Sequence, residues 1–165
     1  MIEAGEVVKN CNLRDYRDED VPRLVEVIRI AFAEFRGKLD PPSSAGLKTV
    51  DVVQSELQEA NAIVAEVDST IVGCVFYRMT EGERVYLDRL SVLPSYRRKG
   101  IARALMEKVE FRARLKAAKS LGLSVGIALA VQQEFYERRG YEFNEYGTHE
   151  GYDSPTYVKM KKELT

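Results

Sequence analysis

The chain reads Arg97-Arg98-Lys99-Gly100-Ile101-Ala102 between an apolar strand pattern at residues 85–92 and a long amphipathic helix pattern. Gly100 and Ala102 leave backbone N–H groups uncovered where the helix begins. Such N–H groups, with the helix dipole behind them, attract phosphate. The three basic residues of the stretch and Arg103 add positive charge at the same place. The stretch therefore predicts a cradle for a cofactor that carries a pyrophosphate, and a solvated basic turn is the alternative for R-x-x-G-x-A alone.

Two common nucleotide-binding loops are absent from the chain. It contains no G-x-x-x-x-G-K-[ST], so the stretch is not a P-loop. It contains no G-x-G-x-x-G either, so the stretch is not a dinucleotide fingerprint.

Apolar spacing predicts an α/β order of elements. We expect strands at 11–16, 62–67, 71–80, 85–92, 121–130, 141–146 and 155–161, and helices at about 21–35, 50–60, 100–119 and 131–139. A loop with two prolines and two serines is expected at 37–46. In the first helix an apolar stripe is expected to lie in the core: Val21, Leu24, Val25, Ile28, Phe32 and Phe35.

Two of the expected strands have unusual patterns. The apolar residues of 85–92 fall on odd positions up to residue 87 and on even positions from residue 90. A one-residue β-bulge near Asp88-Arg89 would produce this change, and a strand buried on both faces is the alternative. Residues 121–130 alternate large apolar side chains with Gly, Ser and Ala, which leaves one face almost bare. A bare face permits close approach by a helix or by a ligand, and the pattern favours neither.

Three short segments are specific for a protein family in combination, although none of them is specific alone. Residues 90–105, LSVLPSYRRKGIARAL, contain R-x-x-G-x-A after an apolar residue and a proline. Phe135-Tyr136-Glu137-Arg138-Arg139-Gly140-Tyr141 follows downstream, and Ile71-Val72-Gly73 lies upstream. In this order and spacing the segments resemble the acetyl-CoA signature, the closing L-Y-x-x-x-G-F and the third-strand I-V-G of the GNAT N-acetyltransferases. The resemblance covers roughly residues 11–162.

The resemblance implies the GNAT fold, an α/β fold with a mixed sheet. Its central, mostly antiparallel sheet has about six to seven strands, is splayed between strands 4 and 5, and is flanked by about four helices. A bulge in the fourth strand helps to splay the two strands so that a pantetheine arm can enter. A single N-acetyltransferase domain over residues 1–165 is expected, and the length suits one domain.

The implied reaction transfers an acetyl group from acetyl-CoA to a primary amine by direct attack through a tetrahedral intermediate. Backbone groups of the fourth strand would hold the pantetheine and polarise the thioester carbonyl, and the pyrophosphate would meet the start of the helix. The expected cofactor-binding residues are Leu90, Ser91, Val92, Arg97, Arg98, Lys99, Gly100, Ile101, Ala102 and Arg103. No metal is expected, because one His and two distant Cys do not make a ligand cluster.

By resemblance Tyr136 faces the CoA sulfur, where a protonated phenol can donate to the leaving thiolate as a general acid. A core tyrosine is the alternative. At three positions the chain departs from the family: Leu129 replaces a frequent Asn, Gln132 replaces a common Ala, and Ser124 replaces a Glu that acts as the base in some members. The motif therefore identifies no general base. Asp88, near the expected bulge, is the candidate base. His149 is expected to be a surface residue of a polar loop.

The resemblance places the amine acceptor, a small molecule or a peptide, between residues 35–48 and 146–154. Glu150 and Asp153 in the second loop, which has no Lys or Arg, favour a cationic amine, and solvated loop residues are the alternative. The alternative function is a GNAT-like module that binds acyl-CoA without transferring the acyl group and serves as a sensor or partner domain.

Composition is that of an ordinary soluble protein, with 45% hydrophobic and 31% charged residues and a net charge of −1. The charge predicts no nucleic-acid partner, and no apolar run approaches the ~20 residues that span a bilayer, so no membrane association is expected. The first six residues lack the features of a signal peptide, and no disulfide framework is indicated. A cytoplasmic location is expected, and a homodimer is left open.

Overall fold

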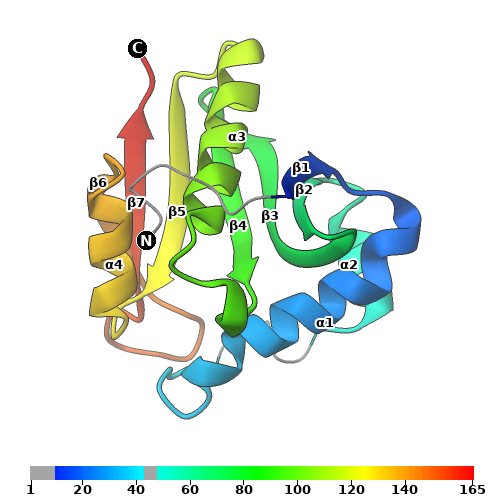
Figure 1. Ribbon diagram of the computed structural model, residues 1–165. Helices are drawn as coiled ribbons and strands as arrows, with labels where there is room; N and C mark the ends of the chain where they lie inside the picture. The colour runs from blue at the N-terminus through cyan, green and yellow to red at the C-terminus, as the bar shows by residue number, and fades with distance from the viewer. Residues whose placement is uncertain (1–9, 43–47) are drawn as a thin grey trace.

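The centre of the molecule is a seven-stranded sheet of order β1-β2-β3-β4-β5-β7-β6 (Figure 1). The computed structural model describes residues 10–42 and 48–165. Its strands are β1 (Cys11–Asp15), β2 (Asn61–Val67), β3 (Thr70–Thr80), β4 (Arg84–Val92), β5 (Ser120–Gly126), β6 (Glu142–Gly147) and β7 (Tyr157–Glu163). Only β4 and β5 pair in parallel. The mostly antiparallel mixed sheet expected from the sequence is confirmed.

Four α-helices of the described residues cover the sheet: α1 (Val21–Phe32), α2 (Val50–Glu56), α3 (Ile101–Leu115) and α4 (Ala130–Glu137). Successive residues of β2 point to opposite faces. Ala62 and Val64 pack in the core with α1 and α2, whereas Ile63 and Ala65 pack in the core with α3. α3 and α4 lie together on one side, in front of the sheet in Figure 1. None of the described helices is long and apolar enough to cross a membrane.

The apolar stripe of α1 is in the core over most of its length, since residues 21, 24, 25 and 28 are buried. Phe32 is partly buried and packs against this core. The prediction is wrong for Phe35, which is partly buried and belongs to neither core cluster, because the α-helix ends at Phe32 and a 3₁₀ turn follows. Both phenylalanines line a cleft.

A β-bulge causes the shift of the apolar residues of β4 from odd to even positions, as expected. Ser91 pairs with Cys74 of β3, and Asp88 pairs with Phe76, so two residues of β4 lie opposite one residue of β3. Arg89 of the bulge has φ of 53°, in the left-handed region. Such an extra residue bends and twists the strand.

β4 and β5 separate after Tyr86 and Gly122, just before the bulge. Their ladder consists of three pairs, from Arg84–Ser120 to Tyr86–Gly122. The strands continue without pairing, to Val92 and to Gly126. The splay expected between the fourth and fifth strands is therefore confirmed, and it opens the sheet from one end.

Some element bounds differ from those expected. α3 ends at Leu115 instead of residue 119, because Ala117 adopts φ of 57°. β5 ends at Gly126, so residues 127–130 leave the strand. Its bare face meets side chains, since a Cβ on Gly126 would lie 2.6 Å from Leu39, and Ser124 and Gly126 of this face line a cleft. Part of the predicted loop, 43–47, and the N-terminal segment 1–9 lie outside the described residues.

Candidate active site

A cleft of about 1020 Å³ occupies the opening between β4 and β5. Residues 87–92 of β4 and 123–126 of β5 form two of its walls. The start of α3, part of α4 and the end of α1 complete it. Its size is that of a site for a large small-molecule ligand.

The N-terminus of α3 opens onto this cleft. Gly100 is the N-cap residue, with φ of 80°, a conformation that side chains rarely adopt. The N–H of Ala104 donates to the Gly100 carbonyl at 3.0 Å, so the N–H groups of residues 101–103 precede the first helical hydrogen bond. Three backbone donors and the positive end of the helix dipole are thus available to an anion.

The expected cofactor-binding residues come together here. All of them line the cleft except Lys99, whose ammonium lies 5.3 Å from the ring of Tyr96. Arg97 also has structural contacts. Its guanidinium pairs with Glu34 at 2.6 Å and donates to the Ala31 carbonyl at 2.9 Å, which ties the loop to the end of α1. The sequence did not reveal this role, because Glu34 is far away along the chain.

Gly73 of the I-V-G segment lies against β4 beside the cleft. It pairs with Val92, and a Cβ at this position would lie 2.9 Å from the Ser91 carbonyl oxygen. Glycine therefore allows β3 to pack closely where β4 lines the cleft.

Tyr136 of α4 lines the same cleft and is partly buried. Its ring packs edge-on against Phe135 and Tyr141, with centroids 5.3 and 6.1 Å away. Burial, followed by the negative charge of Asp88, raises the pKa of Tyr136 to about 12. The hydroxyl is therefore a proton donor throughout the physiological range.

Asp88 lies at the bulge of β4 and also lines the cleft. Its Oδ1 accepts a hydrogen bond from the backbone N–H of Arg89 at 2.9 Å. The Arg89 guanidinium reaches across to Glu56 of α2 at 3.3 Å. The bulge thus turns a carboxylate towards the cavity that holds the Tyr136 hydroxyl, although neither residue neighbours the other in sequence.

The three positions that depart from the family pattern, Leu129, Gln132 and Ser124, all line the cleft. Leu129 is the N-cap residue of α4 and makes no side-chain cap. Gln133 instead donates to the carbonyls of Gly126 and Ile127, at 3.2 and 3.1 Å. Ser124 accepts a hydrogen bond from the Tyr86 hydroxyl at 2.5 Å, and Gln132 lines the cleft. None of these side chains is a carboxylate.

The two loops expected at the acceptor side meet. The Tyr152 hydroxyl donates to Asp40, which joins residues far apart in sequence. Glu150 and Asp153 are exposed and are not among the residues that line the cleft. The acidic side chains that do line it are Glu34, Asp40 and Asp88.

His149 is exposed, as expected, and it also lines the cleft. Its Nδ1 is hydrogen-bonded to the hydroxyl of Thr156, and its ring lies 5.0 Å from that of Tyr157. Only its place in the expected acceptor loop could have indicated this role. The described residues contain no cluster of His, Cys, Asp or Glu that could hold a metal ion.

Residues 58–143 match the family model for the acetyltransferase (GNAT) domain. This match covers more than half of the chain, and the chain belongs to this family. No curated protein matches it.

Solved structures share the fold. The PaiA N-acetyltransferase from Thermoplasma acidophilum, in complex with coenzyme A, is 22% identical with a TM-score of 0.79 over 93% of this chain and 99% of its own. A GNAT family acetyltransferase from Elizabethkingia anophelis with acetyl-CoA bound is 16% identical, with a TM-score of 0.70 over 95% and 100%. The ribosomal-protein-S18-alanine N-acetyltransferase from Escherichia coli is 17% identical, with a TM-score of 0.74 over 94% of each chain.

Proposed function

We propose that the protein transfers an acetyl group from acetyl-CoA to a primary amine. The observation that carries this proposal is a single cleft that joins an uncapped helix N-terminus to a partly buried tyrosine and a carboxylate. Its opening between β4 and β5 suits an extended arm, and the N-terminus of α3 suits a pyrophosphate. Membership of the GNAT acetyltransferase family and CoA-bound structures of the same fold support it.

In this reaction the chain's own groups move protons and orient the thioester. Backbone groups of residues 90–92 hold the pantetheine and polarise the carbonyl. The acceptor first releases its ammonium proton to solvent. Asp88 then takes a proton from the neutral amine nitrogen, directly or through one water, as the C–N bond forms. When the C–S bond breaks, the Tyr136 hydroxyl gives its proton to the sulfur. The proton held at Asp88 then returns to the tyrosinate, so the protein is unchanged at the end of the cycle.

The acceptor approaches from the side of Phe32, Phe35 and the 149–157 segment. Aromatic rings and the carboxylates of Asp40 and Asp88 face this part of the cleft, a composition that attracts an ammonium group on an apolar body. We therefore propose a cationic primary amine, free or at a peptide terminus.

A comparison of the kinetics of Asp88→Asn with those of His149→Gln tests the assignment of Asp88 as the base. We expect Asp88→Asn to lower kcat by about 10²-fold, and His149→Gln to raise KM for the amine more than it lowers kcat. The opposite pattern, with kcat lost in His149→Gln and kept in Asp88→Asn, would make His149 the base.

The second candidate is a module that binds acyl-CoA without transferring the acyl group. The absence of the family's Glu at position 124 and of its Asn at position 129 favours it. Release of free thiol from acetyl-CoA in the presence of amines separates the two functions, because a binding module releases none.

A further inference from the structure

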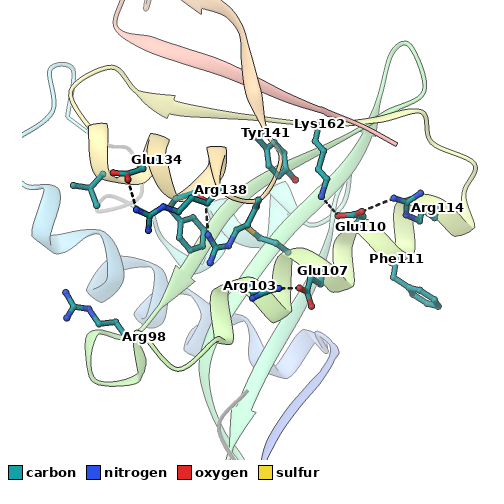
Figure 2. A pocket seen from close by; sticks show the side chains of 14 residues that line it. Arg98, Arg103, Glu107, Glu110, Phe111, Arg114, Glu134, Arg138, Tyr141 and Lys162 are labelled. Atoms are coloured by element: carbon teal, nitrogen blue, oxygen red, sulfur yellow. Dashed lines mark hydrogen bonds and ion pairs between the residues drawn. The ribbon is translucent and has the colours of Figure 1, made fainter. Parts of the chain in front are cut away.

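Two neighbouring arginines in the loop before α3 have different surroundings. Arg98 is exposed and extends from the loop without an ion pair to the other side chains drawn in Figure 2. Arg97 is only partly exposed, and all three nitrogens of its guanidinium donate hydrogen bonds to the protein. Arg98 is therefore open to a ligand, whereas the donors of Arg97 are already used within the fold.

The Arg97 guanidinium connects the end of β4 with the end of α1. Its Nε donates to the Val92 carbonyl at 3.2 Å, and Nη2 donates to the Ala31 carbonyl at 2.9 Å. Nη1 donates to Glu34 at 2.6 Å, in the 3₁₀ turn that follows α1. The last carbonyls of a helix have no partner within the helix, and the negative end of the helix dipole favours a cation there. A phosphate would have to compete with these acceptors for the same nitrogens.

The two ends that Arg97 joins differ in their other contacts. The end of β4 is paired with β3, and beyond it the N–H of Leu93 donates to the Val72 carbonyl at 2.9 Å. The turn after α1, residues 32–36, follows the last buried residue of the helix, Ala31, and its members are exposed or only partly buried. We therefore expect the loss of Arg97 to move this turn more than it moves β4.

The turn after α1 forms part of the amine side of the cleft. Phe32 and Phe35 line the cleft and pack edge-on, with ring centroids 5.7 Å apart. Glu34 also lines the cleft, but its carboxylate is already paired with Arg97. An acceptor at this wall meets two aromatic rings, and the Arg97 contacts hold the turn that carries them.

We propose that Arg97 is a positioning residue for the amine acceptor and not a ligand of the CoA phosphates. It holds the turn after α1 against the loop before α3 and thereby sets Phe32 and Phe35 at the amine side of the cleft. This inference rests on the proposed function, which places the amine at these rings and the pyrophosphate at the N-terminus of α3. Phosphate binding is left to the backbone N–H groups of residues 101–103 and to Arg98.

Steady-state kinetics of Arg97→Met test this assignment, because methionine keeps an unbranched side chain and removes all three donors. We expect KM for the amine to rise about tenfold, as for one charged hydrogen bond lost, with kcat and KM for acetyl-CoA within about twofold of the wild type. Arg97→Lys, which keeps the charge but loses the fork, should lie between. Arg98→Met, the adjacent change, should instead raise KM for acetyl-CoA and leave KM for the amine unchanged.

Glu34→Gln breaks the same link at an exposed position and keeps the shape of the side chain. We expect KM for the amine to rise about threefold, as for a partly exposed ion pair. The double variant Arg97→Met/Glu34→Gln should be no worse than Arg97→Met alone, because both changes break one link. Arg29→Met, on the exposed face of α1 outside the cleft, is the matched control and should leave both KM values unchanged.

Three results would overturn the inference. A rise in KM for acetyl-CoA alone in Arg97→Met would make Arg97 a phosphate ligand. A fall in KM for the amine would mean that Arg97 only masks Glu34, which would then bind the amine itself. Wild-type constants in both variants would leave Arg97 without a part in acceptor binding, and Glu34→Gln decides this if Arg97→Met does not fold. These results leave the proposed function standing, whereas no acetyl transfer by the wild-type protein would overturn that function and this inference with it.

Discussion

Tyr136 is the residue on which the proposed chemistry depends most. Tyr136→Phe removes the proton donor and keeps the packed ring, so we expect kcat to fall by about 10²-fold with little change in CoA affinity. Because its pKa is raised to about 12 from an ordinary value of 10.0, Tyr136 should keep its proton, and activity should not decline, as the pH passes 10. Steady-state rates against pH and calorimetry of CoA binding measure both effects. Unchanged turnover in Tyr136→Phe would reduce Tyr136 to a core residue.

Gly100 tests the phosphate cradle. Its φ of 80° disfavours most side chains, so any substitution strains the cap, but asparagine tolerates this conformation and carries no charge. We expect Gly100→Glu to abolish CoA binding, because its carboxylate would lie among the phosphates, and Gly100→Asn to weaken it far less. Calorimetry on both folded variants compares them. Equal affinities in the two variants would show that the phosphates lie elsewhere.

Among the site residues, those of one contiguous motif could be predicted, and those that depend on distant contacts could not. The expected cofactor-binding residues between 90 and 103, apart from Lys99, line the cleft because a strand, a turn and a helix bring them there in order. Arg97 pairs with Glu34, and His149 bonds to Thr156, through contacts that only the fold creates. For the same reason the sequence did not show that Glu150 and Asp153 stay outside the cleft.

At the scale of elements, periodicity predicted the strands and helices, and local backbone geometry decided where they end. The bulge in β4 could be predicted because it shifts every later side chain to the other face. The end of α3 could not, since a left-handed alanine at residue 117 stops the helix where no glycine signals it. Burial on both faces also explains why β2 lacks a clear alternation.

The close packing of β3 on β4 gives a test at this scale. Gly73→Ala places a methyl group 2.9 Å from the Ser91 carbonyl, and a backbone atom cannot move away as a side-chain tip can. We expect the free energy of unfolding to fall by about 1–3 kcal/mol, and CoA affinity to fall as well, because β4 must shift beside the cleft. Urea denaturation and calorimetry measure the two losses. If Gly73→Ala kept the wild-type free energy of unfolding, β4 could shift at Ser91 without a measurable cost.

At the scale of the whole molecule, one ion-pair network joins β1 to the start of α1 and to β2. Arg14 binds both oxygens of the buried Asp20, at 2.8 and 3.1 Å, and pairs with Glu66. Asp20 also accepts the N–H of Arg17 at 2.7 Å. The hydrogen bond from Arg14 holds the pKa of Asp20 below its ordinary value of 3.8.

This network makes stability depend on pH. Because its folded-state pKa is lowered, Asp20 stabilises the fold at pH values above 3.8, and the contribution is lost as pH falls through the folded-state pKa. We expect Asp20→Asn to lower the free energy of unfolding by about 2 kcal/mol at pH 7 and by much less near pH 2. Urea denaturation at both values measures the difference. The exposed Asp18→Asn is the control and should have little effect at either pH. An equal loss for Asp20→Asn at both pH values would contradict the role of its charge.

The most direct test of the account is a transfer assay. Purified protein is incubated with acetyl-CoA and a panel of polyamines, amino acids, aminoglycosides and peptides with free N-termini, and both free thiol and acetylated amine are measured. We predict thiol and acetylated product in equal amounts for at least one cationic amine, with turnover lost in Tyr136→Phe. Tight binding of acetyl-CoA without thiol release or product from any amine would contradict acetyl transfer and favour the binding module.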